Sequence, residues 1–188
     1  PQAVVPPGPG ITAEPIRVRP LDAVNPDGLG LAPPERAGLP RELWGATPTA
    51  DLARMIRAER VDTLPAVQSL LTAIILAELA PPLDSDASGT LFLARIDKLL
   101  DLGALDPAVA LLEMLDKPGP EAFRRWFDAA LLVGEEDHAC QKMNENPEIA
   151  PTIPARIYCQ ARLGDWASAD LTLQSATVLG QMQPDEVA

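Results

Sequence analysis

Apolar positions in the second half of the chain repeat around three glycines, Gly103, Gly134 and Gly164, which lie 31 and 30 residues apart. Apolar side chains at helical spacing precede each glycine, and an alanine and a larger apolar residue follow it. Such spacing on both sides of a glycine predicts two amphipathic helices, with the glycine as the left-handed cap of the first. We therefore expect three helical hairpins over residues 89–180. The repeated positions are Ile96, Phe127 and Ile157; Leu100, Leu131 and Ala161; Leu102, Val133 and Leu163; Ala108, Ala139 and Ala169; and Leu112, Met143 and Leu173.

Residues 49–82 have the pattern of a pair of helices. The first is expected over 49–59, with Thr49 as its N-cap, and the second over 64–79, with Pro65 in its first turn. The apolar run of the second helix contains polar side chains and falls short of the roughly 20 residues that a membrane span requires. We interpret it as a buried helix that ends before a pair of prolines.

The first 48 residues differ from the rest because they contain 11 of the 21 prolines. Proline fixes φ and removes a backbone donor, so residues 1–48 are expected to form an extended tail with a turn at 25–28. The tail is either an unstructured linker or a segment docked on its own helices or on a partner. Burying an indole offsets part of the entropy of ordering the chain. Leu39, Leu43 and Trp44 are therefore candidate partner-binding residues. Residues 181–188 are expected to form a C-terminal tail.

Composition supports an all-α fold. Aromatic residues make up 4% of the chain, and the apolar residues are mostly Ala and Leu. These residues favour helices packed through small side chains over a sheet built from β-branched and aromatic residues. The predicted fold is a stack of antiparallel helical hairpins preceded by the extended Pro-rich segment.

The formal net charge of −12 limits the partners of the chain. A phosphate backbone or an anionic membrane surface attracts clustered Lys and Arg, which this composition does not favour. We therefore expect no nucleic-acid partner and no membrane span, and attribute the acidity to a solvated surface.

Two segments resemble metal sites. Asp84, Asp86 and Ser88 are spaced like the first oxygen ligands of a calcium-binding loop, but Arg95 stands where the bidentate acid belongs and would repel the ion. Asp86 or Ser88 is expected instead to cap the helix that begins near residue 90. The only histidine, His138, lies among acids that fan around a helix start, which favours helix-dipole interactions over zinc or nickel. We predict no metal and no cofactor.

The two cysteines, Cys140 and Cys159, fall on neighbouring antiparallel helices of the predicted stack. A disulfide between them is geometrically reasonable and would indicate an oxidising compartment. Two buried thiols, a metal site or a reactive thiol are the alternatives. The disulfide interpretation favours a periplasmic or exported protein.

Catalytic signatures are missing from the sequence. It contains no nucleophile elbow, phosphate-binding glycine loop, dinucleotide fingerprint or H-E-x-x-H zinc motif. An enzyme acting on carbohydrate or peptidoglycan would need two carboxylates in a cleft, about 5 to 9.5 Å apart. The candidates for that alternative are Asp97, Asp101, Asp128 and Asp165. Apart from this alternative, we expect the protein not to be an enzyme.

The phrase LGDWASA at residues 163–169 resembles the tetratricopeptide repeat family, whose helix-turn-helix unit often carries L-G-D-Y-x-x-A at its turn. Pro120 and Pro151 lie seventeen residues after Gly103 and Gly134, as that family's pattern would place them. The resemblance covers about residues 89–180 and implies a protein-interaction scaffold. It departs from the family in its shorter period and in having large residues in mid first helix.

The overall layout resembles a group of Ala- and Pro-rich exported proteins of alphaproteobacteria. Some of these carry the label antifreeze glycopeptide, but the Ala-Ala-Thr repeats of such glycopeptides are absent, so this resemblance implies export alone. The expected function is a non-catalytic scaffold or accessory subunit of a bacterial cell-envelope assembly. Its helices would form a platform and its tail would dock on a neighbouring subunit. Trp166 is a further candidate partner anchor, unless it packs against the preceding hairpin.

Overall fold

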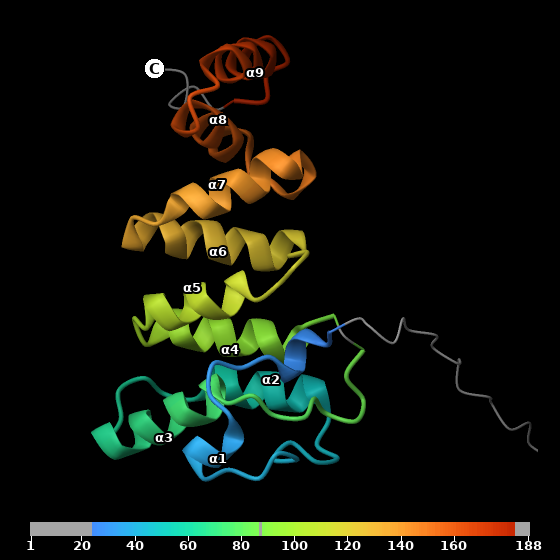
Figure 1. The fold of residues 1–188 in the computed structure, drawn as a ribbon, viewed down its shortest axis with the longest axis vertical. Coiled ribbons are helices and arrows are strands. Elements are labelled where there is room, and N and C mark those ends of the chain that lie inside the picture. Colours follow the sequence, from blue (N-terminus) through green and yellow to red (C-terminus); the bar gives the residue numbers. More distant parts are fainter. Residues whose placement is uncertain (1–23, 87, 183–188) are drawn as a thin grey trace, which may run out of the picture.

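The computed structural model describes residues 24–86 and 88–182, and these are all-α, as predicted. The expectations for residues 1–23 and 183–188 lie outside the described residues. Figure 1 shows α4 to α9 following one another along the long axis, with α1, α2 and α3 gathered at the opposite end from α9. The described helices are α1 (Pro34–Ala37), α2 (Thr49–Ala58), α3 (Pro65–Leu76), α4 (Thr90–Asp101), α5 (Leu105–Glu113), α6 (Pro120–Val133), α7 (Glu136–Glu145), α8 (Ile153–Arg162) and α9 (Trp166–Val178), with short 3-10 turns at η1 (Pro26–Gly28) and η2 (Pro147–Ile149).

The three predicted hairpins are present as α4–α5, α6–α7 and α8–α9, and α5 packs on α6 as α7 packs on α8. Gly103, Gly134 and Gly164 have φ values of 69°, 79° and 84°, the left-handed conformation that glycine adopts at least cost. In each turn, the N–H after the glycine donates over 2.9 Å to a carbonyl five residues earlier, which satisfies an open end of the first helix. The alanines five residues after the glycines are buried, as expected for close-packing positions.

The predicted pair over residues 49–82 is only partly correct. Helix α2 packs mainly on α4, and α3 ends at Leu76 instead of continuing to residue 79. The chain leaves the helix there because the backbone next to Leu76 bonds to the N-terminal segment. Leu31 donates to the Leu76 carbonyl over 2.9 Å, and Glu78 donates to the Ala32 carbonyl over 2.8 Å. This pairing with residues 31–32 replaces the last expected turn.

Within the tail, residues 24–48 fold onto the helices. The predicted turn at 25–28 is confirmed: the Asn25 carbonyl accepts from Gly28 N–H, and its side chain accepts from Asp27 N–H. Trp44 is buried in the core, and Leu39 and Leu43 pack against it half-buried. The segment therefore forms part of the body of the protein.

The predicted caps of α2 and α4 are wrong, because distant carboxylates supply them. Asp84 accepts from both the N–H and the hydroxyl of Thr49 at the start of α2. Asp27, fully buried, accepts from Phe92 N–H in the first turn of α4 over 2.8 Å. Asp86 accepts from Ser88 N–H, and Gly89 occupies the N-cap of α4 without a side-chain cap. Helix N-termini carry partial positive charge, which makes carboxylates effective there.

Two buried cations of α4 bind carbonyls at the C-terminal ends of α3 and α2. Arg95 donates to the carbonyls of Ile75 and Ala77 at the end of α3, over 2.8 and 3.1 Å. Burial lowers the pKa of Arg95 to about 10, and the charge of Asp27 partly opposes that shift. Lys98 donates to the carbonyls of residues 57 and 59 at the end of α2. The charges buried in α4 thus fix the N-terminal segment and both neighbouring helices.

Candidate functional site

An apolar groove of about 280 Å³ lies between α2 and α3. Trp44 forms part of its lining, which places the tail residue predicted to contact a partner in the wall of a surface groove. The other lining residues are mainly apolar: Leu52, Met55 and Ile56 from α2, Val67, Leu70, Leu71 and Ile74 from α3, and Glu59 and Arg60 between the two helices.

Helix α3 leaves this groove open because it is much less buried than its sequence suggested. Ile75 is its only buried residue, whereas Val67 and Leu70 are 46% and 55% exposed. Across the groove, Met55 of α2 is 47% exposed. The expectation of a buried helix is therefore wrong, since an unbroken apolar run does not distinguish a helix buried on all sides from one that lines a groove. Exposed apolar side chains that gather on one surface mark an interaction site.

Exposed apolar side chains also occur at the far end of the stack. Trp166 opens α9 and is 70% exposed, so packing against the preceding hairpin does not bury it. Leu171 and Val178 on the same helix are 66% and 87% exposed. Trp44 and Trp166, paired above as candidate partner anchors, thus differ: the first is a core residue beside a groove, and the second presents its indole to solvent.

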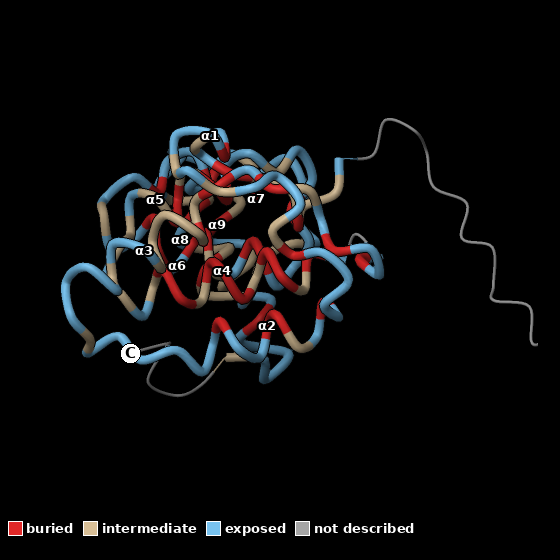
Figure 2. The backbone as a smooth tube through the Cα atoms, turned by 90° about the horizontal axis from the view of Figure 1, so that it is seen from below, coloured by how far each residue is buried: buried red, intermediate tan, exposed pale blue. Residues whose placement is uncertain are grey.

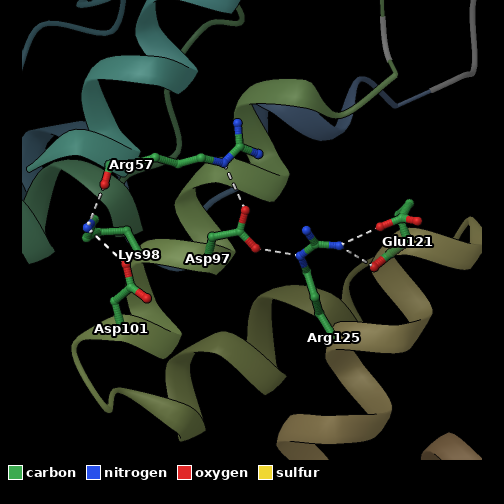
Figure 3. Close-up of polar contacts among 6 residues, drawn as sticks. All are labelled: Arg57, Asp97, Lys98, Asp101, Glu121 and Arg125. Carbon is green, nitrogen blue, oxygen red and sulfur yellow. Dashed lines mark hydrogen bonds and ion pairs between the residues drawn. The ribbon is translucent and has the colours of Figure 1, made fainter.

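The candidate carboxylate Asp97 lies between two guanidinium groups. Arg57 of α2 and Arg125 of α6 both donate to it from opposite sides, and Arg125 also pairs with Glu121 (Figure 3). Burial opposes ionisation of Asp97, but the hydrogen bonds from Arg125 and Arg57 outweigh it and lower its pKa. The cluster joins α2, α4 and α6 and holds Asp97 ionised.

The other three candidate carboxylates are placed apart from one another in the fold. Asp101 pairs with Lys98 at the end of α4, over 3.0 Å. Asp128 is exposed on α6. Asp165 caps α9 by accepting from Ser168 N–H, and hydrogen bonding by Ser168 lowers its pKa. These contacts assign Asp97, Asp101 and Asp165 to holding helices in place.

The remaining polar candidates also have structural contacts. His138 packs its ring edge-on against Trp126 and contacts Glu113 over 3.0 Å. Within residues 24–86 and 88–182, no group of three or more His, Cys, Asp or Glu side chains is arranged to hold a metal ion. Cys140 and Cys159 form the predicted disulfide, with their Cα atoms 4.9 Å apart. It joins α7 to α8.

Comparisons with protein-family models, curated proteins and solved structures find no match for the chain. The helical-hairpin layout agrees with the resemblance noted in the sequence, while membership of the tetratricopeptide family stays a prediction. None of the helices in the described part of the chain is long and apolar enough to cross a membrane. Function has to be inferred from the surfaces themselves, because a fold alone does not specify one.

Proposed function

We propose that this chain is a non-catalytic protein-interaction module whose α2–α3 groove receives an amphipathic helix of a protein partner. The observation that carries the proposal is the open apolar groove, with Met55, Val67 and Leu70 each about half exposed along it. An amphipathic helix lays its apolar face into such a groove and removes both surfaces from water. The alternative of an enzyme with paired carboxylates gains no support from the contacts of Asp97, Asp101 and Asp165.

The rigid surroundings of the groove support this role. Asp84 and Lys98 bind the two ends of α2, and Arg95 binds the end of α3, so both walls are fixed before a partner arrives. A preformed groove loses little conformational entropy on binding, which favours affinity. The module would act as a scaffold or accessory subunit of a larger assembly.

A periplasmic or exported location is part of the proposal. The Cys140–Cys159 disulfide supports it, because disulfides persist in oxidising compartments and are rare in the cytosol. The cell envelope is therefore the compartment in which a partner should be sought.

Site-specific crosslinking tests the proposal. A benzophenone amino acid placed at Val67 or Met55 in the source cells is expected to form an adduct with the same partner protein from both sides of the groove. The matched control is the same amino acid at Arg124, which is exposed on α6 and should form no such adduct.

The Leu70→Asp substitution then separates specific from random capture. It puts a charge into the groove at a side chain that is 55% exposed, so the fold should be retained while the adduct from Met55 is lost. Adducts of equal yield from groove and control positions, or an adduct that Leu70→Asp leaves unchanged, would contradict the proposal.

A further inference from the structure

Helix α9 repeats the positions through which the earlier hairpins contact their successors. Counted from the hairpin glycines, Trp166, Asp170 and Leu173 correspond to Glu136, Cys140 and Met143 of α7. In the first hairpin the same positions are Leu105, Val109 and Leu112 of α5. The three positions follow i, i+4, i+7 spacing, so they lie on one face of each helix.

In α7 this face is covered by α8. Cys140 is bonded to Cys159 of α8, and Glu136 accepts from the Tyr158 hydroxyl over 2.9 Å. Arg162 of α8 lies 3.4 Å from Glu136 and 2.7 Å from Asp137 beside it. Glu136, Cys140 and Met143 are all buried. The start of α7 thus contacts the end of α8, and a basic side chain of α8 pairs with an acidic side chain of α7 on the shared face. In α5, Val109 and Leu112 are likewise buried, and α5 packs directly on α6.

On α9 the same face is open. Trp166 is 70% exposed, Asp170 is exposed, and Leu173 is half-buried. Asp170 accepts only from Gln174 on its own helix, over 2.7 Å, so its charge has a neutral partner there. Figure 1 shows α9 as the last described helix of the stack, with α8 on one side of it.

We infer that this face of α9 is a second docking surface, for a basic amphipathic helix of a protein partner that lies antiparallel to α9 as α8 lies to α7. The docked helix places an Arg or Lys against Asp170 and a second cation over the face of Trp166. The pairing of Arg162 with Glu136, the counterpart of Trp166, is the template for the cation over the indole, and cations bind well over such a ring. The cation at Asp170 follows from charge complementarity, because Asp170 is an exposed acid whose hydrogen-bond partner is neutral. The net charge of −12 adds a general attraction for a basic partner. This surface is separate from the α2–α3 groove.

The probe that tests it is a synthetic peptide of residues 151–163, which contain α8, with Cys159→Arg and a lactam bridge that keeps it helical. The matched control is the same peptide with Cys159→Glu. The bound α8 cannot be exchanged for either peptide, because the disulfide ties it to α7. Trp44 and Trp126 are buried, so acrylamide quenching of tryptophan fluorescence in the whole protein reports mainly on Trp166. The peptides contain no tryptophan.

The Arg peptide is expected to protect Trp166 from quenching, with a Kd at least about tenfold lower than that of the Glu peptide. In the Asp170→Lys protein the Glu peptide should bind more tightly than the Arg peptide. Asp170 is exposed, so the urea midpoint of this variant should match that of the parent protein. The inference is overturned if neither peptide protects Trp166 at millimolar concentration. It is also overturned if the two bind equally, or if the order survives Asp170→Lys. None of these results affects the groove, which crosslinking from Val67 tests independently.

Discussion

The two ends of the molecule are held together by different means. Within each of the hairpins α4–α5, α6–α7 and α8–α9, the turn closes with a glycine and a backbone bond that spans five residues. From η1 to the start of α4, charged side chains bind helix ends across long stretches of chain, as Asp27 binds Phe92. Figure 2 shows buried segments both along α2 and α4 and in the irregular chain beside them. The repeats are specified by residues close together in sequence. The N-terminal cap, as we call the part from η1 to the start of α4, depends on hydrogen-bonded residues that are far apart in sequence.

The two regions also differ in how many other elements each of them contacts. Each hairpin packs on its neighbours in the stack, with α5 on α6 and α7 on α8, as in other repeat proteins, and the first hairpin also packs on α2. The N-terminal segment contacts α3 through Leu31 and contacts α4 through Asp27, whose carboxylate accepts from Phe92 N–H and whose carbonyl accepts from Arg95. We therefore expect the N-terminal cap to lose more stability than the repeats when a single capping residue is removed.

The largest effect should come from Asp27→Ala. The substitution uncaps α4 and leaves the buried Arg95 without its compensating charge, which should lower the free energy of unfolding by about 3 to 5 kcal/mol. The matched control is Asp165→Ala, which removes an exposed cap from α9 and should cost clearly less. Urea unfolding measures both values. Equal losses from the two variants would contradict the comparison.

Reduction of the disulfide tests how far a change in the repeats affects the N-terminal cap. The bond closes a loop between residues 19 apart in sequence, so breaking it should lower the stability by about 3 kcal/mol on the loop-entropy estimate. Hydrogen exchange should quicken in α7, α8 and α9 and stay unchanged in α2. A double Cys140→Ser and Cys159→Ser variant should respond to no reductant. Faster exchange in α2 would mean that the two ends are coupled more tightly than their contacts indicate.

Gly30→Ala tests the close approach of the tail to the end of α3. A Cβ atom there would lie 2.2 Å from the backbone nitrogen of Glu78, and backbone cannot move aside as a flexible side chain can. We expect a loss of about 1 to 3 kcal/mol, measured by thermal unfolding. Gly119→Ala is the control, since Gly119 has a φ of −69° and no neighbour within 4 Å of the added atom. A Gly30→Ala protein as stable as the control would show that the contact with Glu78 is dispensable.

The same contrast explains how far the sequence could predict the fold. The hairpins around Gly103, Gly134 and Gly164 were predictable because helix period, glycine turn and buried alanine all occur within one repeat. The caps from Asp27 and Asp84 were missed because nothing near either residue identifies a helix start tens of residues away. Local capping rules pointed to Thr49, Asp86 and Ser88 instead.

The candidate site was predictable only in part. Leu39, Leu43 and Trp44 were named as candidate partner-binding residues, and the tail was expected either to be unstructured or to dock. In the structure they pack in or against the core of their own chain, whose other members lie far away in sequence. The groove itself was missed because burial of Val67 and Leu70 depends on what packs beside α3 and not on their apolar character. The disulfide was predictable because the hairpin register placed its two cysteines on adjacent helices.

The smallest expected effect lies where the two regions meet. Asp97 of α4 forms ion pairs with Arg57 of the N-terminal cap and with Arg125 of the second hairpin, so it links the two regions. Its pKa in the folded protein is lowered, since the two arginines outweigh its burial. The link therefore stabilises the fold fully above the ordinary aspartate pKa of about 4 and is lost as the pH falls through the lowered value.

The Asp97→Asn substitution should remove this pH dependence. All three side chains are partly exposed, so the gain above pH 4 should stay below about 1 kcal/mol, and salt should weaken it further. Unfolding free energies of parent and variant should therefore differ at pH 7 and converge as the pH falls below the lowered pKa of Asp97. Asp128→Asn is the control, because Asp128 is the exposed equivalent of Asp97 in the next hairpin. If the Asp97→Asn and parent curves ran parallel from pH 7 downwards, the Asp97 carboxylate would add no measurable stability between the two regions.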